Sequence, residues 1–155
     1  MSPATDTSGI KGQESCSWFE IHHLINKIAQ QVKAKQRAYD CILGVANGGI
    51  IPAKLLAEEL NMDAIQLIPI RKKQIVMDDM PKLDKKKSYL VVDDIYDTGD
   101  TFKILSQILK EYKCDYAFCM SRYRHNIGIS GMILNHNRWI IFPWESDSYK
   151  QVTKF

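Results

Sequence analysis

Hydrophobic and polar positions alternate along this chain in two kinds of stretch. Five apolar runs have the length of buried strands, and they cover residues 41–46, 64–70, 88–92, 115–120 and 138–142. Three longer stretches repeat apolar residues at near-helical spacing, and they cover residues 17–32, 50–60 and 101–112. Strands that alternate with helices predict the α/β class, with a mainly parallel sheet flanked by helices.

Local signals mark where several of these elements begin or end. Ser17 and Glu20 have the spacing of a capping box, which predicts that the first helix begins at Ser17. The sequence Asn47-Gly48-Gly49 predicts a tight turn after the first strand. Residues 1–15 are polar and are expected to form a flexible leader, and residues 16–155 are expected to form a single domain.

Two segments do not follow the pattern. Residues 71–87 are highly charged, contain Pro81 and show no clean period, which predicts a mobile loop or a ragged hairpin. This segment is either a solvated connection or a functional flap. Residues 121–137 are polar and are expected to be irregular.

Composition narrows the function classes. The chain has 155 residues, of which 45% are hydrophobic and 25% charged, and no apolar run is long enough for a membrane span. A net charge of +3 permits an anionic substrate but does not require nucleic acid. The four cysteines form no CxxC pair, so free thiols and a reducing, cytoplasmic location are expected.

A cluster of acidic residues follows the predicted strand that ends at Val92. Ligands of parallel sheets bind beyond the carboxyl ends of the strands, which selects the loops after Ala46 and after Val92. Three acids, Asp93, Asp94 and Asp97, lie within five positions, and such closely spaced charges repel one another. Binding of Mg²⁺, of sugar hydroxyls or of a base that needs a proton acceptor would each explain why these acids lie together despite their repulsion.

A phosphate cradle is predicted directly after the acids. Thr98, Gly99, Asp100 and Thr101 stand at a helix start, where hydroxyls, free N–H groups and the helix dipole favour an anion. The segment therefore combines diol-binding acids with a phosphate site, as a ribose 5-phosphate ligand requires. An acidic loop followed by an ordinary helix cap is the alternative.

The glycine turn and the carboxyl-terminal segment each allow two interpretations. The turn Ala46-Asn47-Gly48-Gly49 leads into a helix, and its amides either hold a pyrophosphate or only turn the chain. In the segment 138–145, Trp139 is either a stacking surface for a flat base or part of the core.

The segment 91–101 resembles the signature of type I phosphoribosyltransferases, which bind 5-phosphoribosyl-1-pyrophosphate (PRPP). The glycine turn and the sequence from Trp139 to Glu145 resemble those of the 6-oxopurine enzymes, which act on xanthine–guanine or hypoxanthine–guanine. The resemblance covers about residues 17–145. It implies the type I phosphoribosyltransferase fold, with a small C-terminal hood built from the chain ends.

The resemblance also implies site roles. Asp93 and Asp94 would hold the ribose hydroxyls and Mg²⁺-bound PRPP, and Asp97 would manage the proton on purine N7. The 5′-phosphate would lie on Thr98, Gly99, Asp100 and Thr101, and pyrophosphate on Ala46, Asn47, Gly48 and Gly49. The base would stack on Trp139 and contact the Ile140 backbone, Glu145, and Arg122 or Arg124 at its O6.

The chain departs from the family pattern at two positions. Asn47 replaces the usual Arg or Lys. The loss of that cation could weaken pyrophosphate binding or transfer the contact to Arg71, Lys72 or Lys73. Ile141 replaces a polar residue of the xanthine–guanine enzymes, so guanine and hypoxanthine are favoured over xanthine.

The implied activity is Mg²⁺-dependent transfer of phosphoribose from PRPP to a 6-oxopurine in purine salvage, by a homodimer or homotetramer. Neither nucleic acid nor a membrane is an expected partner. A sensor of PRPP or nucleotides without turnover, built on the same fold, is the alternative. A Mg²⁺-dependent phosphatase or receiver domain is a third hypothesis, because Asp93 and Asp94 end a strand.

Overall fold

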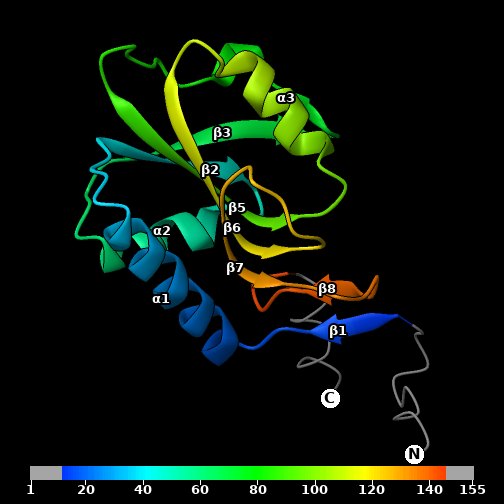
Figure 1. Ribbon diagram of the computed structural model, residues 1–155. Helices are drawn as coiled ribbons and strands as arrows, with labels where there is room; N and C mark the ends of the chain where they lie inside the picture. Colours follow the sequence, from blue (N-terminus) through cyan, green and yellow to red (C-terminus); the bar gives the residue numbers. More distant parts are fainter. Residues whose placement is uncertain (1–11, 146–155) are drawn as a thin grey trace, which may run out of the picture.

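The computed structural model describes residues 12–145, and its centre is a six-stranded sheet in the order β4-β3-β2-β5-β6-β7 (Figure 1). Its strands are β2 (Cys41–Ala46), β3 (Ile65–Arg71), β4 (Gln74–Ile75), β5 (Ser88–Tyr96), β6 (Lys113–Ser121) and β7 (Ile129–Ile133). Neighbouring strands are parallel except β3 and β4, which pair antiparallel. The predicted α/β class is confirmed.

Helices cover both faces of this sheet (Figure 1). Helices α1 (Trp18–Ala34) and α2 (Ile50–Glu59) lie on one face, and α3 (Asp100–Ile108) lies on the other. The central strand β5 serves both sides, because Leu90 and Val92 enter the α1–α2 core while Tyr89 and Val91 enter the α3 core. This alternation explains why β5 is apolar at consecutive positions. No helix within residues 12–145 is long and apolar enough to cross a membrane.

A small second sheet joins the two ends of the described chain. Strand β1 (Gln13–Ser15) pairs in parallel with β8 (Trp139–Ile141), and together they form the hood (Figure 1). The expected flexible leader therefore does not include Gln13–Ser15, because β8 supplies a partner that local sequence does not reveal. Residues 1–11 lie outside the described part, as do residues 146–155.

Several element boundaries differ from the sequence-based prediction. Strand β5 continues past Val92 to Tyr96, because β6 runs beside it to the pairs Ile95–Met120 and Tyr96–Ser121. Helix α3 begins one residue earlier than predicted and ends at Ile108 instead of Tyr112. The segment 121–137 is not wholly irregular, because β7 pairs with β6 inside it.

The charged segment 71–87 contains a short hairpin, one of the two predicted alternatives. Strand β4 folds back on β3 through Lys72 and Lys73, both with positive φ, and a 3₁₀ turn, η1 (Met77–Asp79), follows. Two positive φ angles are the geometry of a type I′ turn. Lysine adopts this geometry rarely, and the sequence therefore gave no specific signal for it.

Candidate active site

The candidate site lies where the connections of the sheet change direction. The connection from β2 passes through α2 to β3, whereas β5 passes through α3 to β6 on the other side. Strands β2 and β5 are neighbours, with Gly44 opposite Val92. Their carboxyl ends therefore form the topological switch point at which open α/β sheets bind ligands.

Two adjacent carboxylates stand at the end of this region of β5. Asp93 is 8% exposed, and one of its oxygens accepts the Asp94 amide at 2.8 Å. Asp94 Oδ1 accepts the Ile95 amide at 2.7 Å. Burial raises the pKa of both carboxyls, and for Asp93 the neighbouring Asp94 charge raises the pKa further. Asp93 is buried and Asp94 is partly buried, and two adjacent carboxylates of this kind offer the oxygen ligands that a hard divalent cation prefers.

The glycine turn lies directly against these acids. A Cβ on Gly48 would overlap the Asp94 carboxylate, and a Cβ on Gly49 would overlap the Val92 carbonyl. The Gly49 amide donates to Val45 O at 2.7 Å, which closes the turn, and the Ala46–Asn47 peptide is cis. The structure thus brings together two predicted segments that lie over forty residues apart in the sequence.

The predicted phosphate cradle occupies the start of α3. Gly99, at the N-cap of α3, has φ +89 and supplies no side-chain cap, so first-turn N–H groups beyond the Asp100 amide are left for another acceptor. Thr98 Oγ1 accepts the Asp100 amide at 3.3 Å. The Tyr123 hydroxyl donates to Thr98 O at 3.1 Å and ties the cradle to the segment after β6.

Asp97 stands beside the cradle and forms an ion pair. Arg122 Nε donates to Asp97 Oδ1 at 2.8 Å, and Arg122 Nη1 donates to His136 O at 3.1 Å. The Asp97 side chain is 46% exposed, whereas that of Arg122 is 10% exposed. Of the two arginines considered from sequence, the structure brings Arg122 to Asp97 and leaves Arg124 exposed.

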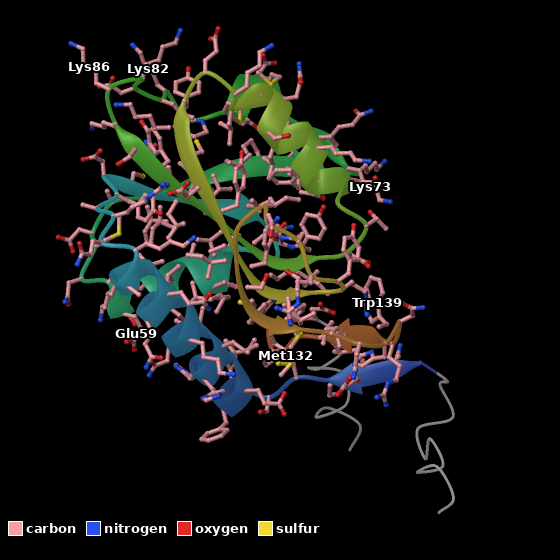
Figure 2. The ribbon with its side chains drawn as sticks, viewed as in Figure 1. Glu59, Lys73, Lys82, Lys86, Met132 and Trp139 are labelled. Carbon is pink, nitrogen blue, oxygen red and sulfur yellow. The ribbon has the colours of Figure 1, made fainter. Side chains whose placement is uncertain are left out.

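A cavity of about 400 Å³ joins the acids and the cradle, whereas its lining includes neither the glycine turn at residues 46–49 nor Arg122. Its lining contains the acids and the cradle, together with Lys73 from the β3–β4 turn and Trp139 from β8. Figure 2 labels Lys73 and Trp139 on the same side of the molecule, above and below the end of the sheet. Trp139 is 57% exposed, so it is a surface ring and not a core residue. The volume is within the range of small-molecule sites.

Some predicted site residues lie outside this cavity. The Ile140 side chain is buried in the core, and the lining does not include Glu145, whose amide donates to Phe142 O at 3.0 Å. Sequence reasoning missed the aromatic residues of the lining, Tyr96, Phe102 and Phe118. In the sequence these three residues have the pattern of ordinary core positions. Only the folded structure places them beside the acids.

A second hollow of about 650 Å³ lies near the amino ends of β6 and β7. It is lined by Lys35, Arg37, Asp115 and residues 125–129. Arg37 and Tyr39 both donate to Asp115 at 2.6 Å, so the single carboxylate of this lining is already engaged. It contains none of the acids at the switch point, which makes the smaller cavity the candidate active site.

Comparison with known proteins finds phosphoribosyltransferases that are similar to this chain in sequence or in fold. A xanthine-guanine phosphoribosyltransferase from Idiomarina loihiensis is 30% identical over 83% of this chain and 84% of its own. The structure of a purine phosphoribosyltransferase from Pyrococcus horikoshii superposes with a TM-score of 0.71 at 25% identity, over 87% of this chain and 95% of that one. A xanthine-guanine-hypoxanthine phosphoribosyltransferase from Helicobacter pylori, 18% identical, has the same fold with a TM-score of 0.72 over 91% of this chain and 99% of its own.

The family comparison covers the whole candidate site except its hood. Residues 17–128 match the phosphoribosyl transferase domain, a span that includes the glycine turn, the acidic loop and Arg122. The acids, the glycine turn and the helix start of this match meet at the switch point of the sheet. The match and the 30% identical relative show that this chain belongs to the phosphoribosyltransferase family.

Proposed function

We propose that this chain transfers the 5-phosphoribosyl group of PRPP to a 6-oxopurine base, giving a nucleoside 5′-monophosphate and pyrophosphate. One observation carries the proposal: the glycine turn after β2 lies against Asp94, the second acid of β5, and the start of α3 follows these acids without an N-cap side chain. PRPP has a pyrophosphate, a diol and a monoester phosphate, and this site offers a separate group for each.

The sugar and its phosphates would be divided among the three segments. Asp93 and Asp94 would accept hydrogen bonds from the ribose hydroxyls, and the turn at residues 46–49, whose Gly49 amide is already bonded to Val45 O, would hold the pyrophosphate. The residues Thr98 to Thr101 would surround the 5′-phosphate at the helix start. Among the three cations of segment 71–73, Lys73 lines the cavity. It would make the charge-assisted contact with pyrophosphate that Asn47 cannot make.

The acid pair has the donor chemistry that Mg²⁺ requires. Within residues 12–145 no group of three or more His, Cys, Asp or Glu side chains could hold a metal alone. Mg²⁺ is commonly bound by one or two carboxylates together with substrate oxygens and water, which suits Asp93 and Asp94 with PRPP. When bound, the ion would neutralise charge on the departing pyrophosphate.

The base would enter beside Asp97 and Trp139. Trp139 has an exposed ring for stacking, and Asp97 is half-exposed and can exchange a proton with N7. The expected contact of Arg122 with the base O6 has no support in the lining of the cavity, because Arg122 lies behind Asp97 and its guanidinium already donates to Asp97 and to His136 O. Guanine and hypoxanthine are the proposed bases, and the named relatives support xanthine as a further one.

The transferred sugar would carry positive charge in the transition state. Acids that already lie in a poorly solvated site favour such charge without reorganising. Closure of segment 71–87 over the cavity would exclude the water that could hydrolyse PRPP. A role in purine salvage, a cytoplasmic location and a homodimer or homotetramer stay predictions from the resemblance.

The test is pyrophosphate release from PRPP and Mg²⁺ with guanine, hypoxanthine, xanthine, adenine or uracil. Asp97→Asn is the matched variant, because an amide oxygen can still accept from Arg122 Nε but cannot take the N7 proton. We expect turnover with 6-oxopurines and a fall in kcat of about a hundredfold in the variant. Nucleotide binding without turnover of any base would contradict the proposal and support the sensor.

A further inference from the structure

A line of polar contacts connects the amino-terminal strand to Asp97. Glu14 of β1 accepts from His136 Nε2 at 2.7 Å. The His136 carbonyl accepts from Arg122 Nη1 at 3.1 Å, and Arg122 Nε donates to Asp97 at 2.8 Å. Four residues from separate segments thereby join the hood to the cavity.

Each member of this line is fixed by a further contact. The Arg138 amide donates to His136 Nδ1 at 3.1 Å, so Nε2 carries the hydrogen that points to Glu14. Glu14 is in register with Ile140 of β8, which holds the segment before β8 against β1. The Arg122 amide donates to Tyr96 O at 2.9 Å, immediately before Asp97.

The two ends of the Arg122–Asp97 contact differ in exposure. Arg122 is nearly buried behind Asp97, whose side chain is 46% exposed and lines the cavity. The guanidinium therefore restrains one carboxylate oxygen from behind while the carboxylate remains open to a ligand. Small displacements of a proton acceptor reduce rates strongly, so a restraint of this kind matters for catalysis.

We propose that Glu14, His136 and Arg122 are positioning residues that fix the Asp97 carboxylate, which makes β1 part of the machinery of the site. The proposal rests on the proposed function, because Asp97 must manage a proton for its position to affect the rate. Glu14 is 45% exposed, so its hydrogen bond with His136 is partly solvated and its removal should have a modest effect.

The test is a double-mutant cycle between Glu14→Ala and Asp97→Asn, in the full-length chain with PRPP, Mg²⁺ and the preferred base. We expect Glu14→Ala to lower kcat about threefold, with the KM for PRPP unchanged. In the Asp97→Asn background the same substitution should leave the residual rate unchanged, because the group that it positions is already lost. Glu14→Gln, which keeps an acceptor for His136, should restore most of the rate.

Two further variants separate positioning from simple loosening of the hood. Glu58→Ala removes an exposed ion pair with Lys54 on α2, outside this line, and should have the wild-type rate. Trp139→Ala should raise the KM for the base, as loosening of the hood would. Equal losses of kcat in both backgrounds, or a Glu14→Ala effect only on the KM for the base, would overturn the proposal.

A readout without turnover distinguishes this proposal from the proposed function. The Arg122 Nε–H resonance can be assigned by its disappearance in Arg122→Lys, and its hydrogen exchange can be followed by NMR. We expect exchange to be about threefold faster in Glu14→Ala than in the wild type. If the wild type turns over no base, the proposed function fails, whereas unchanged Nε–H exchange in Glu14→Ala overturns the positioning line.

Discussion

At the scale of single residues, Gly48 links the two halves of the candidate site. A side chain there would overlap the Asp94 carboxylate, so Gly48→Ala should displace that acid. Overpacking of this kind costs about 1–3 kcal/mol, and we expect the KM for PRPP to rise about tenfold. The measurement is initial rate against PRPP concentration, with the unfolding temperature as control. An unchanged KM would show that Asp94 and the turn can separate without loss.

The buried carboxyl of Asp93 makes a prediction about pH. Because burial raises its pKa in the folded protein, the folded chain keeps a proton that the unfolded chain releases above about pH 4. Its contribution to stability therefore declines as pH rises from this value. Asp93→Asn cannot ionise, and its amide oxygen can still accept from the Asp94 amide.

We therefore expect Asp93→Asn to be more stable than the wild type at pH 7 and to lose this advantage toward pH 4. Urea unfolding of the ligand-free protein at several pH values measures the difference. The exposed Asp63→Asn is the matched control and should show no such trend. A stability difference independent of pH would contradict the assignment of the effect to ionisation.

At the scale of elements, the start of α1 shows how a local signal sets a boundary. Ser17 Oγ accepts the Glu20 amide at 3.1 Å, and Glu20 accepts the Ser17 amide at 3.4 Å, as the capping box predicts. Ser17→Ala should lower the free energy of unfolding by about 1 kcal/mol, because it leaves first-turn donors without a partner.

Denaturant unfolding measures this loss, and Phe19→Ala in the same turn is the control. The Phe19 side chain is 84% exposed, so its removal should change stability by less than about 0.5 kcal/mol. A Ser17→Ala variant as stable as the Phe19→Ala variant would show that solvent replaces the cap.

At the scale of the whole molecule, β5 unites two cores. Leu90 is fully buried in the core with α1 and α2, while its neighbour Val91 packs in the core with α3. Leu90→Ala should lower the free energy of unfolding by about 2–5 kcal/mol, because it leaves a cavity beneath the sheet.

Both faces should still unfold together in the Leu90→Ala variant, since one strand carries both. Coincident transitions by far-UV and near-UV circular dichroism would show this. The exposed Leu67→Ala on β3 is the control. Separate transitions for the two faces would contradict a single cooperative unit.

The sequence by itself determined the parts whose signals are local. The capping box at Ser17, the apolar run of β2 and the helix start after Gly99 were predicted within one residue of their observed places, whereas Asp93 and Asp94 were expected in a loop and lie in β5. Each depends on hydrophobic period, on a turn or on a helix end, which neighbouring residues decide. The class of fold followed from the alternation of these elements.

Only the tertiary structure decided the features that need a distant partner. Strand β1 exists because β8 pairs with it, and the choice of Arg122 over Arg124 depends on how β6 leaves the sheet beside Tyr96. Lys73 reaches the cavity through a turn that lysine seldom adopts. Pairing of distant strands, and the ion pairs that it permits, depends on the register of the whole sheet, which no short stretch of sequence contains.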